Sequence, residues 1–162
     1  MIGVAILTVS DSTVAGTRED VSGPALRQRC EQLNWAVVAT QAVPDEETAI
    51  AHKIRTWADS SIANLILTTG GTGVSARDVT PEATRTVLDR EIPGIAELMR
   101  SAGREQTPLS VLSRAVAGTR KRALIINLPG SPRGAVHSFD AVRHLVSHVI
   151  DLLEGRTEHA SS

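Results

Sequence analysis

Three glycines within four positions form the first segment that could bind a phosphate group. The segment Gly70-Gly71-Thr72-Gly73 follows an apolar run, and its glycines permit positive φ angles and close approach of backbone amides to an anion. It lacks the Gly-Lys-Ser/Thr ending of a P-loop and the G-x-G-x-x-G spacing of a dinucleotide-binding turn. Any nucleotide would therefore be bound in another way. Taken alone, such a glycine cluster more often forms an ordinary turn after a strand.

A second candidate anion-binding segment is Asn127-Leu128-Pro129-Gly130-Ser131-Pro132, which precedes the longest predicted helix. Amides at a helix N-terminus attract anions because they have no partner within the helix. The chain between Glu105 and Asp140 contains no acidic residue and five basic ones, namely Arg114, Arg120, Lys121, Arg122 and Arg133. Such a run is usually a solvated surface, but the glycine segment upstream favours a role in binding an anionic ligand.

Two aspartates are candidate ligands of Mg²⁺. Asp45 follows one predicted strand, and Asp78 follows the glycine segment. One or two carboxylates commonly hold Mg²⁺ while substrate phosphates complete its coordination. Asp45 could instead cap the helix that begins at Glu46, and Asp78 could be a turn or cap residue, because aspartate is favoured at such positions. Convergence of both carboxylates at one edge of a sheet would favour the metal.

The histidines and the single cysteine predict no catalytic or metal centre. His144 and His148 have the i, i+4 spacing of helical zinc ligands, but no third ligand accompanies them, and a partly exposed helix face is the simpler interpretation. Cys30 has no sequence neighbour that would activate it and no second cysteine for a disulfide. This cysteine usage is typical of a reducing, cytoplasmic environment.

Length and composition are those of an ordinary globular chain. With 162 residues we expect one domain over residues 1–155 and a polar tail at 156–162. Seventeen Lys and Arg nearly balance eighteen Asp and Glu, and with two Trp, one Phe and no Tyr the chain has few rings to stack on bases, so nucleic-acid binding is not expected. The apolar run from Met1 to Val9 lacks a basic start and is followed at once by polar residues, which argues against a signal peptide or membrane span.

Hydrophobic patterning predicts the elements that must position these residues. Short apolar runs at 4–9, 65–69 and 123–128 indicate strands covered on both faces, and 36–43 is a fourth expected strand. Helices are expected at 23–33, 46–58, 81–88, 95–104 and 132–153, with Thr80 and Ser131 as caps of the third and fifth. This alternation predicts a parallel α/β sheet, whose ligands bind beyond the carboxyl ends of the strands. Both loops and both aspartates should lie at that edge, whereas Arg120, Lys121 and Arg122 precede a strand and should lie at the opposite one.

Longer motifs resemble those of the molybdopterin adenylyltransferase family. The most specific is Leu67-Thr68-Thr69-Gly70-Gly71-Thr72-Gly73 followed by Arg77-Asp78-Val79-Thr80-Pro81-Glu82-Ala83-Thr84. The others, in family order, are Leu7-Thr8-Val9-Ser10-Asp11-Ser12, Ser22-Gly23-Pro24, Val43-Pro44-Asp45-Glu46, Glu91-Ile92-Pro93-Gly94, Leu112-Ser113-Arg114 and Ile126-Asn127-Leu128-Pro129-Gly130-Ser131-Pro132. The glycine segment alone also occurs in related competence-damage-type domains, but the ordered set extends to about Gly155 and is far more specific.

The resemblance implies a three-layer αβα sandwich with a mostly parallel central sheet, assembled as a homotrimer. It implies a step of molybdenum cofactor biosynthesis in which the terminal phosphate of molybdopterin attacks the α-phosphorus of MgATP, giving adenylyl-molybdopterin and pyrophosphate. By motif position, Asp45 and Asp78 correspond to the catalytic carboxylates that handle Mg²⁺ and the nucleotide phosphates. The implied binding residues are Ser10, Asp11, Gly70, Gly71, Thr72, Gly73, Ser113, Arg114, Asn127, Pro129, Gly130 and Ser131, and Arg114 is expected at the terminal phosphate of molybdopterin.

Two other functions share parts of this pattern. A domain that carries molybdopterin without using ATP would need the basic loop but not Asp78. A nucleotide-pyrophosphate hydrolase of the competence-damage type would share the glycine segment but use water as its nucleophile. The presence of Asp45, Asp78 and both loops favours the adenylyltransferase, whose product a molybdate-insertion enzyme could receive.

Overall fold

The computed structural model describes residues 1–157 and is built on one mixed sheet with the strand order β2-β1-β3-β6-β5-β4. The strands are β1 (Gly3–Val9), β2 (Ala36–Val43), β3 (Leu65–Thr69), β4 (Arg90–Glu91), β5 (Ala117–Arg120) and β6 (Ala123–Leu128). Four of them, β2, β1, β3 and β6, pair in parallel, whereas β5 runs antiparallel to both β6 and β4. The carboxyl ends of these four parallel strands therefore lie together at one edge of the sheet.

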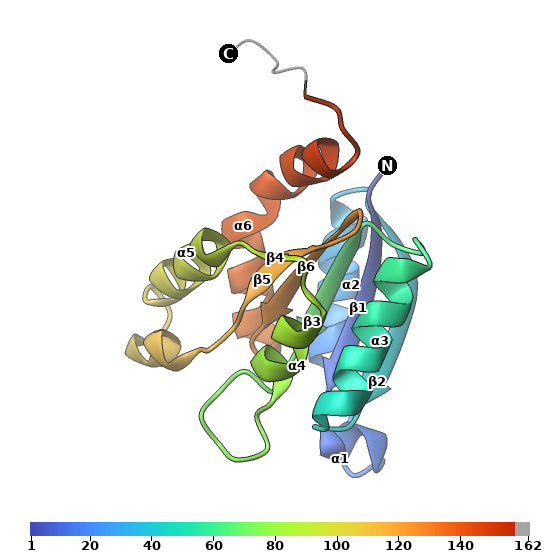
Figure 1. Cartoon of the computed structure of the whole chain (residues 1–162). Helices are drawn as coiled ribbons and strands as arrows, with labels where there is room; N and C mark the ends of the chain where they lie inside the picture. Colours follow the sequence, from blue (N-terminus) through green and yellow to red (C-terminus); the bar gives the residue numbers. More distant parts are fainter. Residues whose placement is uncertain (158–162) are drawn as a thin grey trace.

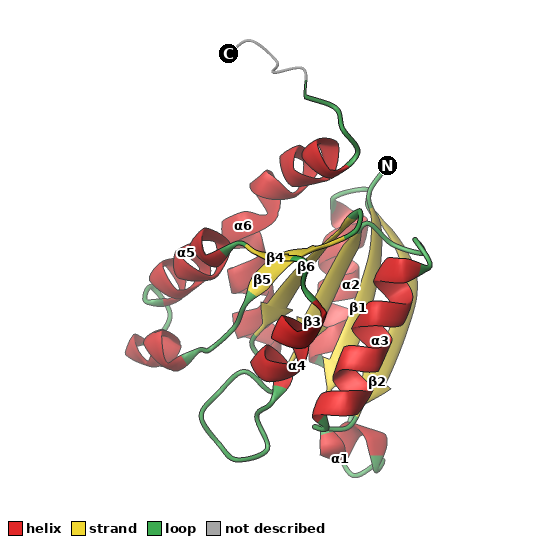
Figure 2. Cartoon of the chain, in the orientation of Figure 1, coloured by secondary structure: helices red, strands yellow, loops and turns green. Residues whose placement is uncertain are grey.

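Helices cover both faces of this sheet (Figures 1 and 2). They are α1 (Asp11–Val14), α2 (Ser22–Gln32), α3 (Glu47–Asp59), α4 (Thr80–Val87), α5 (Pro93–Gly103) and α6 (Pro132–Leu153), with a 3-10 turn η1 (Pro108–Leu112). Side chains of α2, α5 and α6 pack on one face, and side chains of α3 and α4 pack on the other. The expected three-layer αβα architecture is confirmed.

The core follows the alternation of side chains along the strands. Ile6, Leu67 and Ile126, aligned across neighbouring strands, are buried on the face covered by α2, α5 and α6. Their neighbours Ile66 and Ile125 are buried on the face covered by α3 and α4. Burial on both faces accounts for the continuous apolar runs of the central strands.

The sequence predicts the larger elements correctly and two helix caps wrongly. All four expected strands and all five expected helices occur within two residues of their expected bounds. Ser131 caps α6 by accepting a hydrogen bond from Gly134 N at 3.1 Å. Thr80 instead lies inside α4 and donates its hydroxyl to Gly70 O, and Asp45 accepts a hydrogen bond from Asp11 N while Glu46 occupies the N-cap position of α3.

The N-terminus and the end of α6 lie away from the edge at which the parallel strands end. Figure 1 shows α1 and the loop from β3 to α4 on the lower side of the view, and the N-terminus on the upper side. Polar residues 156 and 157 of the expected tail follow α6, and residues 158–162 lie outside the described part of the chain. Within residues 1–157, no helix combines the length and apolar character needed to cross a membrane.

Candidate active site

An open cleft of about 640 Å³ runs along the carboxyl ends of the parallel strands. The segments that follow β1, β2, β3 and β6 all contribute to its wall, together with the start of α2. The cleft brings together eight of the predicted site residues: Ser10, Asp11, Asp45, Gly70, Gly71, Asp78, Gly130 and Ser131. Convergence at one sheet edge, on which the metal hypothesis depended, is therefore present.

Two glycines at the start of the predicted glycine segment have conformations that other residues adopt only with strain. Gly70 has a φ of +104°, and a Cβ there would overlap Val9 O. Gly71 has a φ of +70°, and a Cβ there would overlap the Thr80 hydroxyl. These contacts bring the turn after β3 against the end of β1 and the start of α4, so glycine is needed here for both conformation and space.

Asp11 and Asp45 tie the segments after β1 and β2 together. Each backbone amide donates to the other residue's carboxylate, at 2.9 Å in both directions. Arg77, in the loop between β3 and α4, donates to both carboxylate oxygens of Asp11 at 2.8 to 3.0 Å. The amide of Asp45, and then Arg77, lower the pKa of Asp11, which keeps this carboxylate charged and engaged within the protein.

Asp45 has the opposite electrostatic environment. Burial raises its pKa, and the charges of Asp11 and Asp78 raise it further, although the Asp11 amide and Arg77 act in the other direction. Asp78 Oδ2 accepts hydrogen bonds from the amide and hydroxyl of Ser75 at 3.1 and 2.9 Å. Asp45 and Asp78 thus place negative charge in the cleft that the protein compensates only in part.

This pair of carboxylates fits Mg²⁺ shared with a phosphate ligand. Hard oxygen donors suit that ion, and one or two carboxylates with phosphate oxygens are a common coordination set. Among residues 1–157 no group of three or more His, Cys, Asp or Glu side chains is arranged to hold a metal alone.

The starts of two helices lie in the wall of the cleft. Val21 and Ser22 at the start of α2, and Ser131 and Pro132 at the start of α6, are in its wall. Helix α6 has 22 residues, and the dipole at its first turn favours phosphate oxygens, whereas at the start of α2 Gly23 N already donates to the carboxylate of Asp20. Ser10 caps the short α1 by accepting a hydrogen bond from Thr13 N at 3.2 Å.

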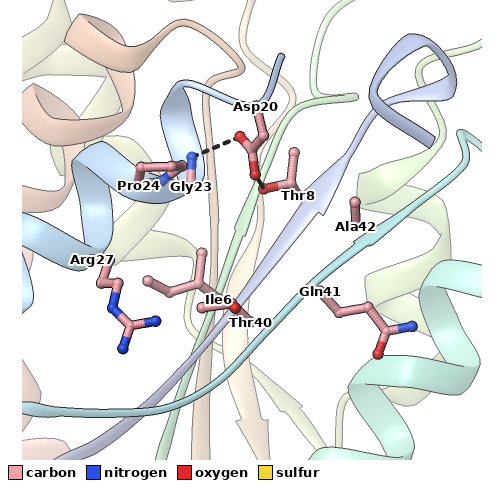
Figure 3. A pocket seen from close by; sticks show the side chains of 9 residues that line it. All are labelled: Ile6, Thr8, Asp20, Gly23, Pro24, Arg27, Thr40, Gln41 and Ala42. Atoms are coloured by element: carbon pink, nitrogen blue, oxygen red, sulfur yellow. Dashed lines mark hydrogen bonds between the residues drawn. The ribbon is translucent and has the colours of Figure 1, made fainter. Parts of the chain in front are cut away.

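Asp20 and Thr8 also line the cleft and were not predicted as candidate site residues from the sequence. The Thr8 hydroxyl donates to Asp20 Oδ2 at 2.7 Å, and Gly23 N donates to Asp20 Oδ1 at 3.0 Å, so Asp20 caps the start of α2 (Figure 3). Both residues also line an adjoining pocket of about 240 Å³ between α2, β1 and β2. An aspartate three positions before Gly23 in a predicted helix start was the available signal.

Ser113 and Arg114, expected to bind substrate, lie outside the cleft. They line a neighbouring hollow of about 340 Å³ together with Arg85 and Arg100. The Arg114 guanidinium already donates to Glu82 and to backbone carbonyls, and Ser113 Oγ accepts a hydrogen bond from Ala115 N at 3.3 Å. Contact between Arg114 and a phosphate stays a prediction, and the side chain has a different use in this structure.

Asn127 is buried, which conflicts with the expected direct contact with a ligand. Its side-chain amide donates to the hydroxyls of Thr68 and Thr84 at 3.0 Å each, and its carbonyl oxygen accepts from Val116 N at 3.2 Å. It therefore links β3, α4 and the residue before β5. In the same loop, Pro129 O accepts the Thr69 hydroxyl at 2.7 Å, which fixes the path of the segment before α6.

The remaining predicted residues divide between the loop and the rest of the fold. Thr72 is buried and Gly73 is half-buried, and a Cβ at Gly73 would overlap Asp78 Oδ2. Arg120 and Lys121 lie at the opposite edge, where Arg120 pairs with Asp59 at 2.8 Å. Cys30 is buried against α6, which raises the pKa of its thiol to about 12 and agrees with a core role.

Comparison with known proteins places the chain among proteins of molybdenum cofactor biosynthesis. The family described as "Probable molybdopterin binding domain" matches residues 5–148. The molybdopterin adenylyltransferase of Helicobacter pylori J99 is 37% identical over 156 residues, covering 95% of this chain and 89% of the relative. That of Escherichia coli K12 is 38% identical over 152 residues, covering 91% of this chain and 76% of the relative.

Solved structures agree with this comparison. The molybdopterin biosynthesis enzyme MoaB of Thermus thermophilus superposes with a TM-score of 0.90 at 50% identity, covering 96% of this chain and 98% of that one. The Mog protein of Mycobacterium ulcerans gives a TM-score of 0.88 at 35% identity, with 94% and 99% covered. A CinA protein of Thermoplasma acidophilum, at 14% identity and a TM-score of 0.68, shares the fold alone.

Proposed function

This chain belongs to the molybdopterin-binding family of molybdenum cofactor biosynthesis, and from that premise we propose that it is a molybdopterin adenylyltransferase. It transfers AMP from MgATP to the terminal phosphate of molybdopterin. The observation that carries the proposal is the convergence of Asp45, Asp78, the glycine turn and two helix starts on one cleft. These are the parts that a transfer between two phosphate-bearing substrates requires.

The reaction needs alignment and charge neutralisation more than covalent help from the protein. An oxygen of the terminal phosphate of molybdopterin forms a bond to the α-phosphorus of ATP. The bond from that phosphorus to the oxygen bridging toward the β-phosphate breaks, and pyrophosphate leaves with the electron pair. The amide of Gly71 and the first turn of α6 would hold phosphate oxygens in line for this exchange.

Asp45 and Asp78 would hold Mg²⁺ against the nucleotide, where the ion supplies positive charge to the phosphate oxygens. Asp11 supports the positions of these two residues. Its carboxylate accepts hydrogen bonds from the amide of Asp45 and the guanidinium of Arg77. It therefore fixes the segment that carries Asp45 relative to the loop that carries Asp78. The partly uncompensated charge at Asp45 gives the cleft its attraction for the ion.

The two alternative functions use less of this arrangement. A carrier of molybdopterin would have no use for Asp78 facing the same cleft as Asp45. A pyrophosphate hydrolase would place water where the proposal places a phosphate, and the likeness to a CinA protein at 14% identity concerns the fold alone. Curated relatives named molybdopterin adenylyltransferase, at 37 to 38% identity, favour the transferase.

We also propose that the chain works as a homotrimer, as the family resemblance implies. Three apolar side chains of η1, Leu109, Val111 and Leu112, are at least 50% exposed, and burying them between copies would stabilise an assembly. Sedimentation at micromolar concentration should give about three times the chain mass of 17.2 kDa. A monomer at that concentration would remove this part of the proposal.

The decisive experiment incubates purified protein with molybdopterin, ATP and Mg²⁺ and separates the products. Adenylyl-molybdopterin and pyrophosphate should form in equal amounts and only when all three components are present. Binding of molybdopterin without product formation would indicate a carrier. Cleavage of adenylyl-molybdopterin by water, without its formation, would indicate a hydrolase. Added molybdate and a molybdate-insertion enzyme would then show whether the product is passed on.

A further inference from the structure

Arg114 makes contacts that connect both ends of one loop. Its Nε donates to Gly73 O at 2.7 Å, and one terminal nitrogen donates to Asp78 O at 2.7 Å. Its backbone amide donates to Thr72 O at 2.8 Å. The other terminal nitrogen donates to both carboxylate oxygens of Glu82, at 2.7 and 3.0 Å. One residue therefore bonds to the first residues of the 72–78 loop, to its last residue and to the first turn of α4.

Besides Arg114, this loop is held by Arg77, which donates to Asp11 at 2.8 to 3.0 Å. Residues 74–77 are exposed. Within the loop, the amide and hydroxyl of Ser75 donate to the Asp78 carboxylate, and Asp78 N donates to Ser75 O at 3.0 Å. Asp78 has its carbonyl bonded to Arg114 and its carboxylate facing the cleft. A change in the position of Arg114 would therefore move the backbone that presents this carboxylate.

We propose that Arg114, held by Glu82, is a positioning residue that sets the place of Asp78 in the cleft, rather than an arginine that binds the phosphate of molybdopterin. The role of Asp78 toward the nucleotide rests on the function proposed above, whereas the restraint of the loop by the Arg114 and Glu82 pair is independent of it. The planar guanidinium is required because it reaches two carbonyls and a carboxylate at once, which a lysine ammonium does not reproduce.

A phosphate contact would have to displace part of this network. All three nitrogens of the guanidinium already donate, and Glu82 neutralises its charge at hydrogen-bond distance. The carboxylate of Glu82 would also face the incoming anion and repel it. Arg114 shares none of the lining of the 640 Å³ cleft, whereas Asp78 is part of it.

The chain offers a matched control for breaking this pair. Glu82 bonds Arg114 and Glu91 bonds Arg85, at 2.7 and 3.0 Å, and both glutamate side chains are 39% exposed. Only the first pair touches the loop. The experiment compares Glu82→Ala, Glu82→Gln, Glu91→Ala and Arg114→Lys with the unchanged full chain. It measures hydrogen exchange of the peptide covering residues 72–79 and the Mg²⁺ concentration that gives half-maximal ATP binding by calorimetry.

We expect Glu82→Ala and Arg114→Lys to accelerate exchange of the 72–79 peptide and to raise the required Mg²⁺ about tenfold, with molybdopterin affinity unchanged within about twofold. Glu82→Gln should recover part of both effects, because its amide oxygen still accepts a hydrogen bond, and Glu91→Ala should show neither. A variant combining Glu82→Ala with Arg114→Lys should be no worse than either alone, since the two residues act as one unit.

The opposite results would overturn the proposal. Unchanged hydrogen exchange in Glu82→Ala would show that the Arg114 and Glu82 pair does not restrain the loop. A loss of molybdopterin affinity in Arg114→Lys, with unchanged exchange and unchanged Mg²⁺ dependence, would make Arg114 a ligand contact. If the unchanged protein forms no adenylyl-molybdopterin, the proposed function fails, and the exchange comparison still decides whether Arg114 restrains the loop.

Discussion

Asp59 and Asp45, at opposite edges of the sheet, have opposite electrostatic environments. At the edge where β5 turns into β6, Asp59 accepts two hydrogen bonds from Arg120, at 2.8 and 2.9 Å, and lies 3.6 Å from Lys121. These contacts lower the pKa of Asp59, with the Arg120 hydrogen bond as the main cause. At the cleft edge, Asp45 is part-buried near Asp11 and Asp78, and its pKa is raised.

This difference separates charge used for stability from charge kept for binding. A carboxylate paired within the protein favours folding, because its charged form has a partner in the native state. A carboxylate left near others of the same sign costs stability until a cation or a proton arrives. The cleft edge therefore holds an unsatisfied charge of the kind that catalytic sites keep, and the far edge does not.

The largest effect is expected at Asp78. Asp78→Asn keeps an oxygen that can accept the two Ser75 hydrogen bonds but removes the charge directed at Mg²⁺. We expect adenylylation to fall by on the order of 100-fold or more, the size typical for loss of one electrostatic group at a transition state. The Tm should change little. Turnover like that of the unchanged chain would refute the metal role, and a collapse of Tm would make Asp78 a structural residue.

The next effect tests the turn that shapes the cleft. Gly70→Ala places a Cβ against Val9 O at a φ of +104°, and we expect a loss of unfolding free energy of about 2 kcal/mol or more, with a large loss of ATP binding. Gly16→Ala is the matched control, because Gly16 also has a positive φ, +77°, but open space around it. Equal urea midpoints for the two variants would show that the close approach at Gly70 is unimportant.

These two positions also show how far sequence alone could locate the site. The glycine segment, Asp45 and Asp78 were predictable because each follows a predicted parallel strand, and topology brings such segments to one edge. The two-residue β4 and the short β5, Ala-Gly-Thr-Arg, carry too few apolar residues for a strand signal. Their antiparallel pairing is settled by tertiary contacts rather than by local pattern.

The uses of Asn127 and Arg114 were beyond prediction for a different reason. Both carry polar groups that could serve a ligand or the protein itself, and the sequence does not reveal which partners lie nearby. The partners of Asn127 are Thr68 and Thr84, 59 and 43 positions away, and Glu82 lies 32 positions from Arg114. Buried polar groups take whichever partners the fold supplies, so only the structure shows that these are internal.

Neutralising one aspartate at each edge should shift the urea midpoint by a smaller amount and in opposite directions, which tests the comparison directly. Asp45→Asn should raise the urea midpoint at pH 7, because the folded protein raises the pKa of Asp45 and so disfavours its charged form. Asp59→Asn should lower the midpoint, because the folded protein lowers the pKa of Asp59. The Asp45 difference should narrow as the pH falls from the raised pKa of its folded state to the unfolded value of about 3.9, whereas the Asp59 difference should narrow only as the pH falls below about 3.9, toward the lowered pKa of its folded state.

If Asp45→Asn and Asp59→Asn moved the urea midpoint in the same direction, the contrast between these two aspartates would be wrong. Activity supplies a second readout, since Asp45→Asn should lose adenylylation while gaining stability, and Asp59→Asn should keep adenylylation while losing stability. Removing Arg77 as Arg77→Met should move the acidic limb of the rate profile to higher pH, because its positive charge lowers the pKa of Asp45.

The smallest effect is expected when Arg120, Lys121 and Arg122 are changed together to glutamine. The six residues of β6 separate these side chains from the loop before α6 by about 20 Å at 3.3 Å per residue, which is about two and a half times the screening length of about 8 Å at physiological salt. We therefore expect the Kd values of ATP and molybdopterin, measured at that salt concentration, to change by less than about twofold. The urea midpoint should fall slightly, because Asp59 loses Arg120. A tenfold loss of molybdopterin affinity would instead mean that the ligand reaches the far edge, and the cleft would then not be the site of its terminal phosphate.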